Sequence, residues 1–340
     1  MDWENYLTPI GKFEACRSNC LGSFFPQRKK IHNLFEILSP RSVLCMGSGY
    51  LNDIPIEDFL KAGASIYLVD WAKNISREAY CKDIVAKEEG GYNCCISKAK
   101  DPQKYCQNFV TQKLFRNQNV CAGFKASAEA PSLCASFEFN SEPSFLEEDV
   151  TQGKASAFAA RISSMLPEAK SPKAVFKNAL KEVNRLKNHS QALPVEDHSI
   201  DLVTSSMVVS QFEHEPYGFM TQMLMEKFGK ETLAEMEKNL NPYMEKLRDA
   251  LFLLLAEGHF QEIHRVLTEN GRAYFSLENF HWDMITDRWF QVRNFSATLE
   301  IMEKYFWFDF DTLPGSFIAD RVGIMGDECI VQTYVLEPKH

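Results

Sequence analysis

Near its N-terminus the chain reads as a strand, a glycine turn, a helix and a second strand. The apolar run Ser42–Met46 predicts the first strand, and Gly47-Ser48-Gly49 follows it directly. Residues 56–62 predict a short helix, and Ile66–Val69 predicts a second buried strand that ends at Asp70. Two strands joined through a helix form a parallel βαβ unit, because a parallel pair needs a crossover connection. The chain is therefore expected to fold around a parallel sheet.

The rest of the chain continues this alternation. Further strands are predicted at 144–146, 201–207, 272–277 and 329–336, and helices at 76–88, 155–186 and 216–270, the last interrupted at Asn241-Pro242. The repeated β-α-β order predicts a doubly wound α/β sheet. We interpret residues 1–40 as a helical N-terminal lid or substrate segment and residues 41–340 as the core, with large insertions at about 74–143 and 214–258.

Charge and hydropathy argue against several classes of partner. The 340 residues include 37 basic and 46 acidic side chains, a net charge of −9, which disfavours a nucleic acid as partner. The basic triplet Arg28-Lys29-Lys30 is interpreted as a solvated helix face. The apolar run Leu251–Ala256 is far shorter than the roughly 20 residues of a membrane span. The polar, acidic start Met1–Asn5 predicts no signal peptide, so we expect a cytoplasmic protein.

The chain has ten cysteines, which raises the question of a metal site. Five of them lie in the first insertion, at positions 94, 95, 106, 121 and 134. The sequence contains no C-x-x-C pair, and no histidine lies among those five to complete a set of ligands. We therefore expect reduced thiols and no bound metal.

The glycine turn and Asp70 together predict a nucleoside-binding site. Glycine lets the backbone pass close to a ligand, and the helix after the turn presents unpaired N–H groups. Asp70 lies 70 − 49 = 21 positions after Gly49, close to the roughly 20 expected for an acid that binds ribose hydroxyls. A dinucleotide fingerprint has a third glycine where this chain has Asn52, which disfavours a nicotinamide cofactor. The phosphate-binding pattern G-x-x-x-x-G-K-[ST] does not occur.

Several separated blocks resemble the class I, Rossmann-like S-adenosylmethionine-dependent methyltransferases. Val43–Gly49 is similar to the first motif of that family, Ile66–Trp71 to the second and Glu148–Val150 to its acidic third motif. Leu193–Phe212 is similar to the fourth strand with its lead-in, and Glu262–Ser276 to the helix, turn and fifth strand that follow. The resemblance implies a mostly parallel seven-stranded sheet, with S-adenosylmethionine as cofactor and S-adenosylhomocysteine as product.

The resemblance also implies roles for the residues after the first two strands. Gly47, Ser48 and Gly49 would approach the methionyl and ribose parts of the cofactor. Asp70 would bind the ribose hydroxyls, and Trp71 would pack on the adenine edge, although a tryptophan there is also ordinary core. These residues form the first half of the implied cofactor site.

The second half follows the third and fourth strands. Asp149 would accept a hydrogen bond from the adenine amino group, and Val150 would donate its backbone N–H. Ser205 and Ser206 would line the sulfur end. Plainer alternatives remain, since Asp149 is also a suitable N-cap before Thr151 and the serines are also small residues of a buried strand.

The chain departs from the family pattern in the first motif. Cys45 stands where the family often has an acidic residue, and Leu51 stands where a third glycine is common. Asn52 or Asp53 is expected to supply a polar contact to the methionyl end instead.

Glu213-His214-Glu215 directly follows the fourth strand and supplies the candidate catalytic groups. Methyl transfer from a sulfonium depends mainly on positioning, and a base is needed only where the nucleophile must lose a proton. His214 titrates in the useful range and Glu213 would orient it, the alternative being a solvated charged turn.

The predicted function is methyl transfer to a nitrogen or oxygen nucleophile, on a small molecule in the first instance. Two alternatives stay open, a protein side chain as the acceptor and a catalytically degenerate protein of this fold that acts as a binding module. A nicotinamide oxidoreductase is a third, which the missing glycine argues against.

Overall fold

The computed structural model describes residues 2–7, 24–49, 51–71, 76, 143–283, 288–308, 319–324 and 327–340. The predicted helix at 76–88, apart from residue 76, and the insertion at 74–143 lie almost wholly outside these residues.

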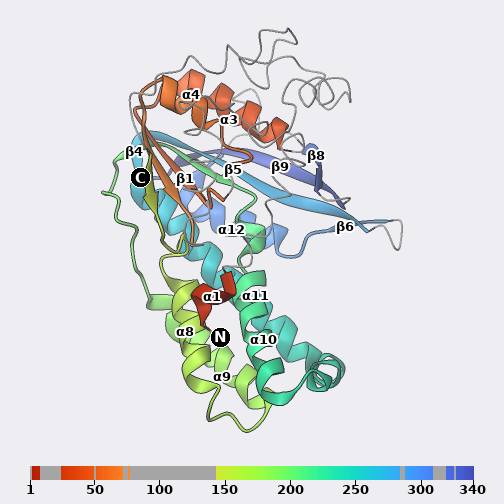
Figure 1. Ribbon diagram of the computed structural model, residues 1–340. Coiled ribbons are helices and arrows are strands. Elements are labelled where there is room, and N and C mark those ends of the chain that lie inside the picture. The colour runs from red at the N-terminus through yellow and green to blue at the C-terminus, as the bar shows by residue number, and fades with distance from the viewer. Residues whose placement is uncertain are drawn as a thin grey trace, which may run out of the picture.

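A single large sheet organises the described part of the chain (Figure 1). Its strands are β1 (Ser42–Met46), β2 (Ser65–Val69), β3 (Ser144–Leu146), β4 (Ile200–Ser206), β5 (Leu267–Asp283), β6 (Arg288–Gln291), β7 (Phe306–Trp307), β8 (Ala319–Ile324) and β9 (Asp327–Pro338). The main path runs β3-β2-β1-β4-β5-β9-β7, with β6 on β5 and β8 on β9. Neighbours from β3 to β5 are parallel, and β9 is antiparallel to β5 and β7. The prediction of a mostly parallel sheet with seven strands along its path is confirmed.

Helices cover both faces of this sheet, which makes it doubly wound. The helices are α1 (Trp3–Leu7), α3 (Phe25–Leu38), α4 (Ile56–Lys61), α8 (Lys154–Met165), α9 (Pro172–Arg185), α10 (His214–Phe228), α11 (Glu231–Val266) and α12 (Phe295–Tyr305). Figure 1 shows α3 and α4 on one face and α11 and α12 on the other. Val43 and Cys45 pack toward α3 and α4, whereas Leu44 and Met46 pack into the opposite core. A strand that is covered on both faces has to be apolar throughout, which is why this one is so evident in the sequence.

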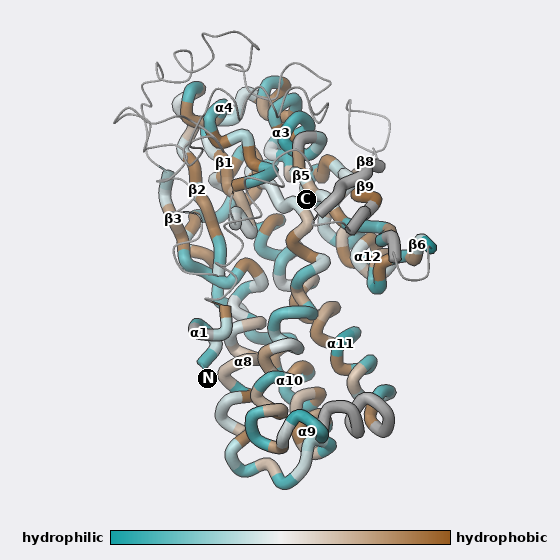
Figure 2. Tube along the Cα trace, turned by 45° about the vertical axis from the view of Figure 1, so that its right-hand side comes forward, coloured by the Kyte–Doolittle hydropathy of each residue, from teal (hydrophilic) through white to brown (hydrophobic). Residues whose placement is uncertain are grey.

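The helices α8, α9, α10 and α11 extend away from the sheet as a bundle, as Figures 1 and 2 show. The single helix predicted at 155–186 is two helices, α8 and α9. The predicted break at Pro242 is wrong, because α11 runs through it without interruption. Pro242 is exposed, so water can satisfy the carbonyl that loses its helical partner, and buried neighbours such as Leu247 hold the helix to the core.

The fifth strand is longer than predicted. The last residues of the helix predicted at 216–270 belong instead to β5, which begins at Leu267 directly after α11. A Cβ on Gly271 would lie 2.9 Å from the carbonyl oxygen of Ile200, so glycine permits the close approach of β4 at this point.

The basic triplet is not simply a solvated face. The Arg28 guanidinium donates to the carbonyl oxygens of Leu51 (3.2 Å) and Ile54 (2.7 Å) and pairs with Glu57 (2.7 Å). Lys30 Nζ donates to Thr333 Oγ1 at 3.3 Å, and Lys29 is the exposed member. Arg28 thus ties α3 to the segment that follows the glycine turn.

The described residues contain neither a candidate membrane span nor a candidate metal-binding cluster. No described helix is long and apolar enough to cross a membrane, and no group of three or more potential metal ligands lies together within the described ranges. Cys45 is a buried free thiol whose pKa burial raises to about 12, so it is unreactive.

Candidate functional site

A cavity of about 170 Å³ opens at the carboxyl ends of β1, β2 and β4. Its walls are Gly47, Asp70, Trp71, Val150, Ser206, Met207, Val208, Gln211 and Phe212. In the order β3-β2-β1-β4-β5, the strand order reverses between β1 and β4. Open α/β sheets bind ligands outside the carboxyl ends of their strands at such a reversal. Five of the residues predicted for the cofactor site line this cavity.

The turn after β1 has the tight backbone that its glycines predict. Gly47 has φ +67°, and a Cβ there would lie 2.4 Å from a side-chain carbon of Val208. Gly49 has φ +45°, and its N–H donates to Asp70 Oδ2 at 2.9 Å. Any other residue at position 47 would push against the opposite wall of the cavity.

Ser48 lies in this turn but does not line the cavity. It is buried, and its hydroxyl bonds Ser76 Oγ at 2.6 Å and the carbonyl oxygen of Val69 at 3.3 Å. Ser76 Oγ in turn donates to the carbonyl oxygen of Gly49 at 3.0 Å. The structure therefore gives the Ser48 side chain a bracing position behind the turn.

Asp70 and Trp71 both reach the cavity from the end of β2. The bond from Gly49 occupies one lone-pair site of the Asp70 carboxylate, which has about four. The Trp71 ring meets Trp3 of α1 edge-on at 5.8 Å and Phe212 at 6.5 Å between ring centroids. The N-terminal helix is thereby packed against a cavity wall.

Asp149 and Val150, although adjacent, are placed differently. Val150 lines the cavity. Asp149 is buried, and its carboxylate accepts from the backbone N–H groups of Thr151 (2.9 Å) and Ser156 (2.8 Å) and from the Thr151 hydroxyl (2.5 Å). These contacts are those of a helix N-cap, the alternative role that the sequence allowed for Asp149. Asp149 is not among the described residues of the cavity wall.

Ser206 lines the cavity, but Ser205 points to the opposite face of the sheet. Ser206 Oγ bonds Ser276 Oγ of β5 at 3.0 Å. Ser205 Oγ bonds His259 Nε2 at 2.8 Å, and His259 Nδ1 bonds the carbonyl oxygen of Val150 at 3.0 Å. Successive residues of a strand face opposite sides, so only one of the two serines can reach the ligand side.

The His259 ring connects β4 to the cavity wall through a defined tautomer. Burial lowers the pKa of His259 to about 4, so the ring is neutral at neutral pH. A carbonyl oxygen only accepts, so Nδ1 carries the hydrogen, and Nε2 accepts from the Ser205 hydroxyl. This role of His259 could not be predicted from the sequence, because a histidine within an apolar helical run carries no local sign that its ring joins Ser205 to Val150.

The segment directly after β4 contributes four wall residues that had no predicted role, Met207, Val208, Gln211 and Phe212. Met207 has φ +56°, an unusual conformation for a residue with a side chain, and its N–H donates to the carbonyl and hydroxyl oxygens of Ser276 at 3.0 and 3.1 Å. The sequence feature that could have identified these four wall residues is their position shortly after Ser205 and Ser206.

Two polar residues follow the glycine turn, Asn52 and Asp53, and Asp53 is hydrogen-bonded to the cavity-wall residue Ser206. Asn52 Oδ1 is buried and has no hydrogen-bond partner among the described residues. Burial raises the pKa of Asp53, against the opposing effects of a hydrogen bond with Ser206 and the charge of Arg28. An orphaned oxygen and a carboxyl beside the wall residue Ser206 suit a ligand with N–H groups, such as the methionyl ammonium of the implied cofactor.

Glu213 and His214 lie at the start of α10 and are not among the described wall residues. Glu213 is buried, pairs with Arg248 of α11 at 2.8 Å and accepts from Asn294 Nδ2 at 2.9 Å. Its carboxylate thus holds α10, α11 and the start of α12 together. His214 is exposed, and partial desolvation of its ring lowers its pKa.

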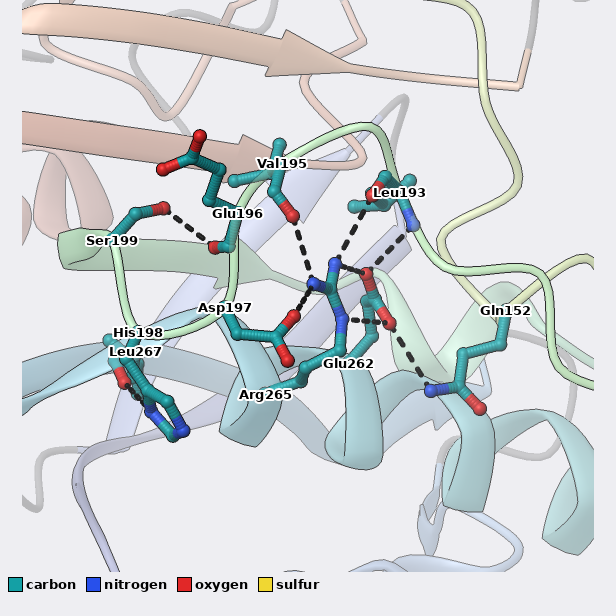
Figure 3. A network of polar contacts seen from close by, with 10 residues as sticks. All are labelled: Gln152, Leu193, Val195, Glu196, Asp197, His198, Ser199, Glu262, Arg265 and Leu267. Atoms are coloured by element: carbon teal, nitrogen blue, oxygen red, sulfur yellow. Dashed lines mark hydrogen bonds and ion pairs between the residues drawn. The ribbon is translucent and has the colours of Figure 1, made fainter.

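The lead-in to β4 is fixed by a buried ion pair on α11 (Figure 3). Glu262 is fully buried, pairs with Arg265 and accepts from Leu193 N (2.9 Å) and Gln152 Nε2 (3.2 Å). Arg265 also donates to the carbonyl oxygens of Leu193 and Val195. The network joins the 193–199 segment and the turn before α8 to one helix, which sets where β4 enters the sheet.

No family model and no curated protein matches this chain. Solved structures do resemble it. The 1,6-didemethyltoxoflavin-N1-methyltransferase of Burkholderia thailandensis, with bound S-adenosylhomocysteine, is 10% identical with a TM-score of 0.35, over 93% of this chain and 79% of that one. A methyltransferase of Methanosarcina mazei is 10% identical with a TM-score of 0.36, over 88% and 92%. The arsenic(III) methyltransferase of Chlamydomonas reinhardtii is 12% identical with a TM-score of 0.35, over 87% and 62%.

Proposed function

We propose that this chain is an S-adenosylmethionine-dependent methyltransferase that acts on a nitrogen or oxygen nucleophile of a small molecule. The observation that carries the proposal is the cavity at the reversal of strand order. Residues from four separate stretches of the sequence, each predicted for the cofactor site, line it together: Gly47, Asp70 with Trp71, Val150 and Ser206.

The chemistry of each wall residue suits it to one part of the proposed cofactor: the ribose, the adenine or the methionyl end. Asp70 can accept from ribose hydroxyls, and Trp71 and Phe212 offer aromatic surface to the adenine. Val150 is the candidate for a backbone contact to the adenine, since the Asp149 carboxylate already accepts from its own turn. Asn52, Asp53 and Ser206 are the candidates for the methionyl end. The cofactor supplies a methyl group on an already activated sulfur, and the chain supplies binding and orientation.

The proposed lid is α1, in keeping with the interpretation of residues 1–40. Trp3 contacts Trp71 of the cavity wall and Phe219 of α10, the latter at 5.3 Å between ring centroids. Tyr6 stacks on Trp3, and its hydroxyl is hydrogen-bonded to Glu215, which together with burial raises the Tyr6 pKa to about 12. An aromatic cover excludes water from a site where methyl transfer competes with hydrolysis.

The acidic surface and the apolar cover favour a small or neutral acceptor over a nucleic acid. A protein side chain remains the alternative acceptor. A binding protein without catalysis is the second candidate, because Glu213 is engaged in an ion pair and His214 is exposed rather than in the cavity.

The proposal is tested by calorimetric titration of the purified chain with S-adenosylmethionine and, separately, with S-adenosylhomocysteine. Micromolar binding of both is the expected result, with the acceptor then sought among small molecules first. Absence of binding by either compound would sink the proposal.

Replacing Asp70 by Ala is expected to weaken S-adenosylmethionine binding by about 1–3 kcal/mol, or roughly 5- to 150-fold, because it removes the ribose acceptor. Calorimetry of the variant measures the loss. Asp201→Asn is a matched control, since Asp201 also accepts backbone N–H bonds, from Arg41 (2.9 Å) and Ser42 (3.2 Å), but at the opposite edge of the sheet. Equal affinities of Asp70→Ala and wild type would contradict the ribose contact.

A further inference from the structure

The exposed face of α9 is basic, although the chain as a whole is acidic. Lys173, Lys177 and Lys181 occur four residues apart, so they follow one line along the helix with a rise of about 6 Å from each to the next. Lys170 precedes the helix, Lys187 follows it, and all five lysines are exposed. The net charge of the chain is −9, so this lysine face has the opposite sign to the molecule around it.

The fold does not use these lysines. Four of the five have no hydrogen-bond or ion-pair partner among the described residues, and the fifth, Lys173, lies over the ring of Tyr243 with its Nζ 5.8 Å from the ring centroid. Like charges four residues apart on a helix repel each other and weaken the helix. A local arrangement that opposes folding and has no compensating contact is typical of a functional surface.

The acid of α9 does not neutralise the lysine face. Glu182 is the one acidic residue of the helix, and it pairs with Arg185 and, at 3.9 Å, with Arg161 of α8. The nearest preceding acid, Glu168, lies outside the helix. Both arginines are engaged by Glu182, so the free positive charges of this face are lysines.

The opposite face of α9 anchors the helix in the bundle. Val175, Phe176, Ala179 and Val183 are buried in the main core, where α9 packs against α8 and α11. Figures 1 and 2 show this bundle extending away from the sheet. No residue of 170–187 is among the described residues of the cavity wall, so the lysine face is a surface separate from the cavity.

The chemistry of the lysine face narrows the class of partner. Carboxylates of acidic peptides are best matched by the planar fork of arginine, whereas lysine is a point charge that neutralises phosphate without a fixed geometry. A membrane-surface helix inserts its apolar face into the lipid, and the apolar face of α9 is buried in protein. Sites for single-stranded nucleic acid combine cations with aromatic rings that stack on bases. The one aromatic residue of 170–187, Phe176, is buried.

We infer that the lysine face of α9 is a docking surface for the phosphate backbone of a nucleic-acid duplex. A line of lysines neutralises phosphates along the duplex and reads no bases, so the binding is independent of sequence. The acidic remainder of the molecule repels the duplex, which confines the contact to this face. The surface holds the protein on a duplex and is not the site of methyl transfer, so the inference does not rest on the proposed function.

The test is binding of the full chain to a fluorescein-labelled DNA duplex of about 20 base pairs, and to an RNA duplex of the same sequence, followed by fluorescence anisotropy between about 50 and 200 mM salt. Five lysine contacts predict that the logarithm of the affinity for DNA falls with the logarithm of the salt concentration with a slope of about −4.5, or about −0.9 for each phosphate. Binding of either duplex with such a slope supports the inference, and the tighter of the two identifies the natural partner as DNA or RNA.

The triple variant Lys173→Gln, Lys177→Gln, Lys181→Gln tests the face itself. Loss of three phosphate contacts is expected to make the slope shallower by about 2.7 and to lower the affinity at low salt about tenfold or more. Thermal melting verifies that the variant is folded. We expect a melting temperature no lower than that of wild type, because the changed side chains are exposed and two repulsive pairs are removed.

The control variant removes the same charge from other elements. It changes Lys29 of α3, Lys61 of α4 and Lys304 of α12, which are all exposed, to Gln, and it is expected to keep the wild-type slope. Equal losses in the two variants would overturn the inference, because net charge rather than α9 would then govern binding. Failure of wild type to bind either duplex at low salt, or equal binding of the single strand, would overturn it too. Tighter binding to polyglutamate or to phosphatidylserine vesicles would replace the duplex by an acidic protein or a membrane.

Discussion

Replacing His259 by Leu is expected to destabilise the protein by about 2–4 kcal/mol, because two buried polar groups lose their partner. The Ser205 hydroxyl and the carbonyl oxygen of Val150 both bond this ring, and both belong to fully or nearly fully buried residues. His259→Gln keeps a donor and an acceptor on one side chain and is expected to recover part of the loss. Urea unfolding at pH 7 measures both variants. A leucine variant as stable as wild type would show that the bridge contributes nothing.

His259 also predicts a pH dependence of stability. Its pKa falls from 6.5 in the unfolded chain to about 4 in the folded one, because burial disfavours the charged ring. Between these values the unfolded state binds the extra proton, so stability decreases as the pH falls from 6.5 to 4. The 2.5-unit difference corresponds to about 3 kcal/mol.

Between pH 7 and pH 4 the free energy of unfolding of wild type should therefore decrease by about 3 kcal/mol more than that of His259→Gln. Parallel pH profiles of wild type and His259→Gln would contradict the buried neutral ring.

Replacing Arg265 by Ala is expected to cost about 3–5 kcal/mol, since it strands the Glu262 carboxylate in the core without its counter-charge. Glu262 is 0% exposed, and its remaining partners, Leu193 N–H and Gln152, are neutral. The same change also releases the carbonyl oxygens of Leu193 and Val195. The measurement is again the free energy of unfolding in urea.

The chain offers a matched control for this change. Glu182 and Arg185 of α9 form a pair with the same spacing of three residues, but the Arg185 side chain is 72% exposed. Arg185→Ala is expected to cost less than about 1 kcal/mol. Similar losses for Arg265→Ala and Arg185→Ala would show that the Figure 3 network does not hold the lead-in to β4.

The parallel core and the position of the cavity could be predicted from the sequence for a physical reason. Strands buried on both faces are apolar along their whole length, so Ser42–Met46, Ile66–Val69 and the strand near Asp201 are evident as runs. The glycines between strand and helix and the acid at the next strand end are fixed by local backbone geometry and spacing. Gly47 and Asp70 accordingly line the cavity.

Helix and strand limits were less predictable, because packing overrides local signals there. Pro242 does not end its helix, and residues 267–270, predicted as the end of a helix, lie inside β5. Propensity describes what a segment prefers alone, whereas burial of a long apolar face against the sheet decides what it does in the protein.

The sequence by itself thus determined the sheet and the location of the cleft at its carboxyl edge. Only the tertiary structure decided which polar side chains face that cleft. Strand parity turns Ser206 toward it and Ser205 away. The contacts of Glu213 with Arg248 and Asn294 join residues 35 and 81 positions apart. Such pairings depend on how distant segments pack, and no local pattern of residues encodes them.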